Sequence, residues 1–182
     1  MKRWITWSLY ALLGCVGAGH AAVQPDAGKT EYVRGDFRFS VGPAPGFVAA
    51  REMPAQWDPK APGADDTVWR VWLYDNQVDR RRGQDLDYVD YAFQPRSAAN
   101  LGDAGRFQIE FNPEYQRLTL HRVALRRNGA WEDRLIPDKI SLARRETDFE
   151  NDLYDGRVTA MIVLDDVRID DVVRITYTVT GS

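Results

Sequence analysis

Alternation of apolar and polar residues recurs along this chain, and this period of two constrains the fold more than any other feature. In the segment 173–179, apolar side chains occupy every second position between arginine and threonine residues. The segments 37–41 and 107–111 repeat the pattern, each bounded by glycine or proline. Because side chains of a strand point alternately to its two faces, each segment predicts a strand with one buried face.

The segment 117–125 changes its apolar phase part of the way along. Leu118 and Leu120 are followed by apolar residues at odd positions. One extra residue in the strand, a β-bulge, would return all of these side chains to one face. We therefore predict a bulge near His121 and Arg122, with the His121 side chain pointing away from the core.

Two further segments are apolar on both parities. The run 158–164 has apolar residues at nearly every position and predicts a central strand covered on both faces. In the run 69–74, Trp69, Val71 and Leu73 share one parity, and the remaining large apolar side chains share the other. One set must fill the core, and the other is expected to be covered by the chain's own loop, by a partner domain or by a ligand.

Turn signals separate these segments. Asn128-Gly129 precedes Trp131 and predicts a tight hairpin, because both residues tolerate positive φ. Asp155-Gly156 and Asp170-Asp171 are further turn signals at the spacing found in sandwiches and barrels. We therefore predict an all-β fold, an antiparallel β-sandwich with at most one short helix, around 145–153.

The segment 42–63 contains five prolines, which exclude a regular strand ladder. We predict that this proline-rich loop packs over the sandwich through Phe47, Met53 and Trp57.

The N-terminus has the pattern of a secretory signal. Lys2 and Arg3 precede an apolar run, and small residues follow as far as Ala21. We predict a signal peptide over 1–21, a single β-sandwich domain over 22–182, and export to the periplasm. The alternative is a lipoprotein anchored to the membrane at Cys15.

Charge argues against nucleic acid as a partner. The chain has 24 basic and 27 acidic side chains, and removal of Lys2 and Arg3 would leave 22 basic ones. A protein that binds phosphate backbones needs a basic surface.

The side chains that most enzymes use are nearly absent. The one cysteine lies in the predicted signal, and His121 is the histidine that remains after its removal. Nucleophilic catalysis needs a base beside the nucleophile, and a zinc site needs more nitrogen or sulfur ligands than these. We therefore expect no catalytic residue, no metal and no cofactor.

Two carboxylate clusters keep glycoside hydrolysis or calcium binding open as alternatives. The first comprises Asp85, Asp87 and Asp90, and the second lies at 148–155. Acids at turns are usually solvated, and we expect the same here.

The large aromatic side chains are the remaining candidates for a ligand or interface surface. An exposed row of them would suit a stand-alone carbohydrate or cell-wall binding module. The candidates are Trp69, Trp72, Tyr88, Tyr91 and Trp131.

Several short pieces follow one another between residues 107 and 182: QRLTLHRV at 116–123, RNG at 127–129, LARRE at 142–146, LYDGRVT at 153–159 and VVRITYTVTG at 172–181. In this order, the pieces resemble a family of exported bacterial domains of unknown function.

This family typically stands N-terminal to a transglutaminase-like, papain-fold domain. The resemblance implies a non-catalytic β-sandwich module of a periplasmic or envelope protein, with the transglutaminase-like domain as its neighbour or partner. It supplies no catalytic residue, because the family's Cys-His-Asp domain would lie beyond Ser182. The alternative is that this chain is the front part of a transglutaminase-like cysteine peptidase.

Overall fold

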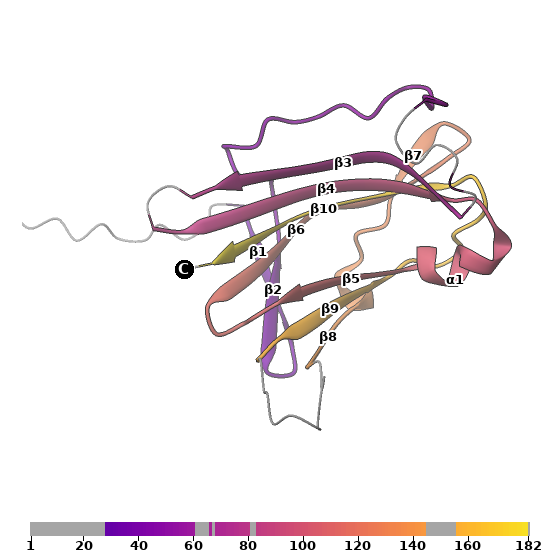
Figure 1. Cartoon of the computed structure of the whole chain (residues 1–182). Coiled ribbons are helices and arrows are strands. Elements are labelled where there is room, and N and C mark those ends of the chain that lie inside the picture. The colour runs from indigo at the N-terminus through magenta and orange to yellow at the C-terminus, as the bar shows by residue number, and fades with distance from the viewer. Residues whose placement is uncertain (1–27, 61–65, 67, 81–82, 145–155, 182) are drawn as a thin grey trace, which may run out of the picture.

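The alternating segments form strands, and the strands form two sheets that pack face to face (Figure 1). The computed structural model describes residues 28–60, 66, 68–80, 83–144 and 156–181. Apart from one short contact, all strand pairs in these residues are antiparallel, so the predicted antiparallel β-sandwich is confirmed.

The large sheet has the order β1-β2-β6-β10-β4-β3, and β7 also pairs with β6. Its strands are β1 (Thr30–Arg34), β2 (Phe37–Val41), β3 (Trp69–Asp79), β4 (Asp85–Pro95), β6 (Gln116–Arg127), β7 (Ala130–Asp133) and β10 (Val172–Gly181). The one parallel contact joins β2 to β6, which the turn signals did not predict.

The small sheet has the order β5-β9-β8 and covers one face of the large sheet. Its strands are β5 (Arg106–Phe111), β8 (Ile140–Arg144) and β9 (Val158–Val163). The prediction that the run 158–164 forms a central strand is confirmed. The prediction that both its faces are covered is wrong on the outer side, where Val163 is 37% exposed.

Short helical turns connect some of the strands. They are η1 (Ala98–Asn100), α1 (Leu101–Ala104) and η2 (Pro137–Lys139). These turns are too short to show a helical period in the sequence. The helix predicted around 145–153 lies outside the described residues, as do the signal peptide predicted over 1–21 and the acidic cluster at 148–155.

The core lies between the two sheets. We call the face of the large sheet that packs on the small sheet its inner face, and the opposite face its outer face. The inner face contributes Leu120, Val123 and Ile175, all fully buried, and the small sheet contributes Ile109 and Ile162. Burial of these aliphatic side chains provides the main stabilisation of the sandwich.

The predicted turns have the expected backbone. Asn128 and Gly129 join β6 to β7 with φ of 51° and 81°, and Asp170 precedes β10 with φ of 71°. The hairpin and this turn are therefore confirmed.

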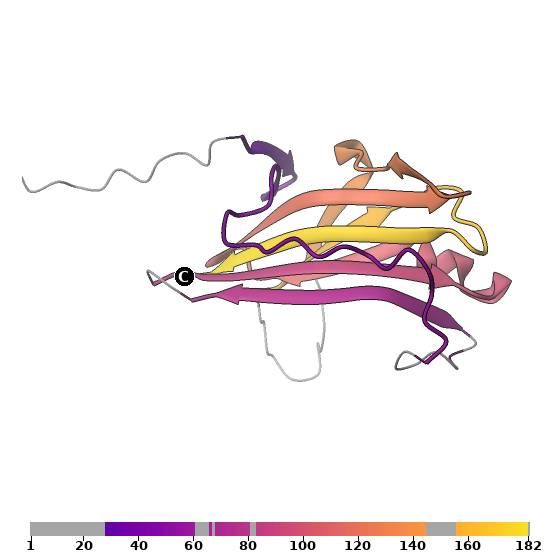
Figure 2. The same ribbon diagram turned by 90° about the horizontal axis from the view of Figure 1, so that it is seen from above.

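Residues 42–60, which we call the strap, cross the outer face of the large sheet. Figure 1 shows the strap on the side opposite the small sheet, and Figure 2 shows that it runs along the length of the strands. Trp57 packs edge to face on Trp72 at 5.6 Å between ring centroids. The described part of the proline-rich loop thus covers the sandwich as predicted.

Candidate functional site

The predicted bulge in β6 is present, and it decides which side chains reach the outer face. Consecutive residues of β10 pair with Arg122 and then with Leu120, so His121 has no partner in the ladder. The extra residue keeps Leu120 and Val123 buried in the core. It also brings His121 and Arg122 to the same cleft on the outer face.

His121 is bonded at both ring nitrogens. Its Nδ1 lies 2.9 Å from the carbonyl oxygen of Gly42, and its Nε2 lies 2.7 Å from the hydroxyl oxygen of Thr178. A carbonyl can only accept, so Nδ1 donates the proton and Nε2 accepts from the hydroxyl. Burial lowers the pKa of His121, which therefore stays neutral near pH 7. The side chain ties the start of the strap to β10.

A buried ion pair lies beside this histidine. Arg174 donates to both oxygens of Asp90 at 2.9 and 2.5 Å, and its Nη2 also donates to the carbonyl oxygen of Arg51 in the strap at 3.1 Å. The hydrogen bond to Asp90 raises the pKa of Arg174. The exposed fractions of the two side chains are 13% for Arg174 and 3% for Asp90. Each charge is therefore neutralised by the other.

The first carboxylate cluster does not converge. Asp87 pairs across the ladder with Val179 on the inner side of β10, whereas Asp90 lies opposite Thr176 on the outer side. Asp85 is exposed at the start of β4. Two acids on opposite faces of a strand cannot flank one glycosidic bond. The geometry of this cluster does not support glycoside hydrolysis.

A second bulge, at Trp72 in β3, was not predicted. Val71 pairs with Phe93 and Leu73 with Ala92, so Trp72 is the extra residue. The bulge breaks the expected parity, because Leu73 leaves the face that Val71 occupies.

The indole of Trp72 lies on the outer face. Its Nε1 donates to Oε1 of Gln94 at 3.0 Å. The guanidinium of Arg126 lies over the Trp72 ring at 4.7 Å and near the Trp131 ring at 5.6 Å. Arg126 of β6 thus links Trp72 of β3 to Trp131 of β7 on the outer face.

The five aromatic candidates do not form one exposed row. Trp69 and Tyr91 contact Phe93 in the core, with ring centroids 5.7 and 5.0 Å apart. Tyr88 is 6% exposed beneath the strap. Trp72 and Trp131 lie together on the outer face, and Trp131 is the more exposed. The arrangement of these five rings therefore gives no support to a stand-alone carbohydrate-binding module, which would need an exposed row.

The strap and the outer face enclose a cleft of about 350 Å³. Its floor holds the polar groups described above, and its roof is apolar. The floor residues are Tyr88, Asp90, His121, Arg122, Arg174 and Thr176, and the roof residues are Ala44, Pro45, Val48 and Ala50.

A second hollow of about 400 Å³ adjoins the first across Arg122. Its far wall is acidic, with Glu132 and Asp133 beside Trp131. Glu132 pairs with Arg134 at 2.5 Å.

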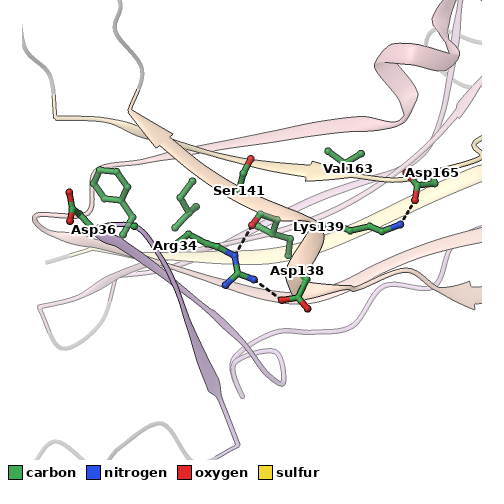
Figure 3. A pocket seen from close by; sticks show the side chains of 11 residues that line it. Arg34, Asp36, Asp138, Lys139, Ser141, Val163 and Asp165 are labelled. Atoms are coloured by element: carbon green, nitrogen blue, oxygen red, sulfur yellow. Dashed lines mark hydrogen bonds and ion pairs between the residues drawn. The ribbon is translucent and has the colours of Figure 1, made fainter.

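The largest of these hollows, about 710 Å³, lies between the β1–β2 hairpin and the edge strand β8 (Figure 3). Arg34 reaches across it, donating to the carbonyl oxygens of Ile140 and Pro137 at 3.2 and 2.7 Å and pairing with Asp138 at 3.1 Å. Lys139 pairs with Asp165 on the other side. We call this hollow the rim groove.

Another ion-pair network closes the turn before β10. Arg127 donates to Asp171 at 2.9 and 2.7 Å and to Asp166 at 3.1 Å. Burial opposes ionisation of Asp171, yet its hydrogen bonds from Arg127 and the Arg168 amide keep the pKa low. The network fixes the turn and pairs the carboxylates of Asp166 and Asp171 with arginines.

Within the described ranges, no three His, Cys, Asp or Glu side chains cluster in a way that could hold a metal ion. In the same part of the chain, no helix has the length and apolar character to cross a membrane.

The protein is a β-sandwich domain in which the small sheet packs on the inner face of the large sheet and the strap crosses the outer face. Residues 81–182 match DUF3857, described as a domain of unknown function with a solved structure, and the chain belongs to this family. The match includes every floor residue of the strap cleft and excludes the strap itself. The family match begins at residue 81, nearer the N-terminus than the resemblance found in the sequence over 107–182.

A crystal structure of a candidate protease from Parabacteroides distasonis is similar over 55% of this chain, with 13% identity and a TM-score of 0.49. The similar region spans only 20% of that protein. A similarity this low carries no argument about function. No curated protein matches the chain significantly.

Proposed function

We propose that this protein is a non-catalytic, exported β-sandwich module that binds a partner domain in the bacterial cell envelope. The observation that carries the proposal is the state of its reactive groups. His121 is neutral and bonded at both nitrogens, and the buried Asp90 is neutralised by Arg174. Side chains used in this way stabilise a fold and are not poised to transfer protons.

The rim groove is the surface we assign to the partner. Strand β8 ends the small sheet, so one side of its backbone has no strand partner in the described residues. Arg34 satisfies the carbonyl of Ile140 at the start of this edge. Beyond it, the exposed Ser141 lines the open groove. An edge strand beside a groove suits the addition of an extended segment from another protein.

Export and the nature of the partner rest on the sequence. The basic start and apolar run of residues 1–21 support secretion, with a lipid anchor at Cys15 as the alternative. The family resemblance supports a transglutaminase-like domain as the partner, either in the same chain or as a separate protein. Under this proposal the module positions that domain and takes no part in its chemistry.

Intact-mass measurement of the protein from its native cells tests export and chain organisation together. A species spanning residues 22–182 in the periplasmic fraction supports a separate exported module, and a lipidated species beginning at Cys15 supports an anchored one. A species heavier by a whole transglutaminase-like domain supports the partner in the same chain, as expected if this is part of a cysteine peptidase. An uncleaved cytoplasmic species would overturn export.

The rim groove is tested with a matched pair of variants. Ser141 and Gln108 both pair with Met161 from opposite sides, so they lie on the same outer face of the small sheet. Ser141→Arg would block the groove, whereas Gln108→Arg lies away from it. Cross-linking in native envelopes should recover a transglutaminase-like domain with the wild type and with Gln108→Arg, and lose it with Ser141→Arg. Equal recovery from both variants, or no such domain with the wild type, would contradict the proposal.

A further inference from the structure

We propose that the cleft beneath the strap is a binding site for a small organic carboxylate. This inference does not rest on the rim groove or on the proposed partner domain. It rests on polar groups that converge on one cavity and are left without partners there.

The hydroxyl groups of two largely buried residues open onto the cleft. Tyr88 and Thr176 are 6% and 5% exposed. In the described part of the chain, neither hydroxyl makes a hydrogen bond to another residue. Among the described residues, neither hydroxyl oxygen is one of the enclosed side-chain atoms that have no partner, so both open onto the cleft, where a ligand could accept their hydrogen bonds.

After the paired charges around the cleft are accounted for, one positively charged side chain, Arg122, has no counter-ion in the described residues. Arg174 and Asp90 neutralise each other, and His121 is uncharged near pH 7 because burial lowers its pKa. Arg122 makes no hydrogen bond or ion pair within the described ranges, and its charge acts on the Tyr88 hydroxyl. Lys29 also lies close enough to affect His121. A local positive charge in a chain with net charge −3 favours an anionic ligand.

The β6 bulge is what places the cation at the cleft. It turns Arg122 and His121 to the same side of the strand, so the histidine holds the strap while the arginine remains available. Bulges commonly aim side chains at functional sites. An arginine guanidinium binds a carboxylate through two parallel hydrogen bonds. Hydroxyl groups alone provide neither this paired geometry nor the positive charge.

The roof of the cleft defines the rest of the ligand. Pro45 and Val48 of the strap present apolar surface opposite the polar floor. A volume of about 350 Å³ lies at the lower end of the range for small-molecule sites. The expected ligand therefore has one carboxylate and a short apolar chain.

The adjoining hollow is the less suitable place for an anion. Arg122 lines both cavities, but Glu132 and Asp133 belong to the second one alone. Their carboxylates would repel an anion, so we assign the carboxylate to the strap side of Arg122.

Titration of the full chain with butyrate and with butyramide, followed by amide and arginine Nε–H NMR signals, tests the site. Butyrate should shift signals of Thr176, Tyr88 and Arg122, and neutral butyramide should bind at least about tenfold more weakly because it lacks the charge. Arg122→Gln should weaken butyrate binding by about tenfold or more, and Arg122→Lys by less. Arg106→Gln is the control, because Arg106 is an exposed arginine on β5, outside the cleft.

Thr176→Val and Tyr88→Phe test the hydroxyl groups, with thermal unfolding as a check that each variant folds. Each should weaken butyrate binding by about threefold to tenfold while leaving the fold intact. Equal binding of butyrate and butyramide, or binding unchanged in Arg122→Gln, would overturn the assignment. It would also be overturned by shifts centred on Trp131 and Glu132, or by no effect of either hydroxyl variant, since Arg122 would then act as a surface charge only.

Discussion

The two faces of the large sheet are both covered, but by different means. The inner face meets the small sheet through aliphatic and aromatic side chains such as Phe93 and Ile175. The outer face meets the strap through directed contacts, among them the bond from His121 to Gly42 and the bond from Arg174 to Arg51. Apolar packing tolerates many sequences, whereas a polar interface depends on a few atoms that must all find partners.

The difference matters for function. The inner face is covered by the small sheet, and the rim groove opens where this cover meets the β1–β2 hairpin. The outer face is bridged by a single irregular segment, and the space beneath it retains polar groups. The inner face of the large sheet therefore supplies most of the stability, and the outer face supplies the polar cleft in which we expect a ligand to bind.

Phe93→Ala should have the largest effect on stability. Phe93 contacts Trp69, Tyr91 and Phe107 and is 4% exposed, so truncation leaves a cavity between the sheets. We expect the free energy of unfolding to fall by about 3–5 kcal/mol in urea denaturation. Phe93→Leu should cost clearly less. A loss below about 1 kcal/mol would show that the inner face repacks freely.

Asp90→Ala should come next. The substitution leaves Arg174 largely buried without its carboxylate, and we expect a loss of about 3 kcal/mol. The double variant Asp90→Leu with Arg174→Met should recover much of this loss, because neither charge remains unpaired. If the double variant is less stable than Asp90→Ala, the pair contributes more than mutual neutralisation.

His121 should make the stability depend on pH. Burial lowers its pKa from the ordinary value of 6.5, so the unfolded chain binds the proton more readily than the folded protein. The free energy of unfolding should therefore fall as the pH drops below 6.5, with a slope of at most about 1.4 kcal/mol per pH unit for one proton. His121→Asn should remove this component when urea denaturation is repeated from pH 7 to pH 5. An identical pH dependence in the variant would show that His121 is not the group responsible.

Gln77→Ala should have a smaller effect than the substitutions above. The Gln77 amide accepts from the Ala49 N–H at 2.9 Å and donates to the Ala49 carbonyl at 2.8 Å, both on the exposed side of the strap. We expect a loss of about 1 kcal/mol, since water replaces these bonds. Gln108→Ala, on the exposed face of the small sheet, should change stability by less than about 0.5 kcal/mol. If Gln77→Ala lowers the free energy of unfolding by more than Asp90→Ala does, the main attachment of the strap is at Gln77.

The inner face could be predicted well from the sequence, because its signal is local. Period-two alternation identified β2, β5, β6, β9 and β10, although β1, β4 and β8 were not predicted as strands. The change of phase between Leu120 and Val123 located the β6 bulge. The same reasoning failed at Trp72, because large apolar side chains on both parities hide a change of phase. The four-residue helix α1 was missed because one turn cannot show a period.

The outer face could be predicted only in part. The sequence indicated that His121 points away from the core, but not that it would bond Gly42, 79 residues earlier. It likewise gave no sign that Asp90 would pair with Arg174, 84 residues later. Long-range polar pairing leaves no periodic trace, so Asp90 was expected to be solvated together with Asp85 and Asp87, whereas it is buried and paired.

The parallel contact between β2 and β6 has a consequence for the order of folding. It consists of only two residue pairs, Ser40 with Thr119 and Val41 with Leu120, and it joins parts of the chain far apart in sequence. Closing such a long loop costs entropy before the few hydrogen bonds repay it. The β1–β2 hairpin and the strap should therefore dock last, onto a sandwich already formed from β3 to β10, and should open first when the protein unfolds.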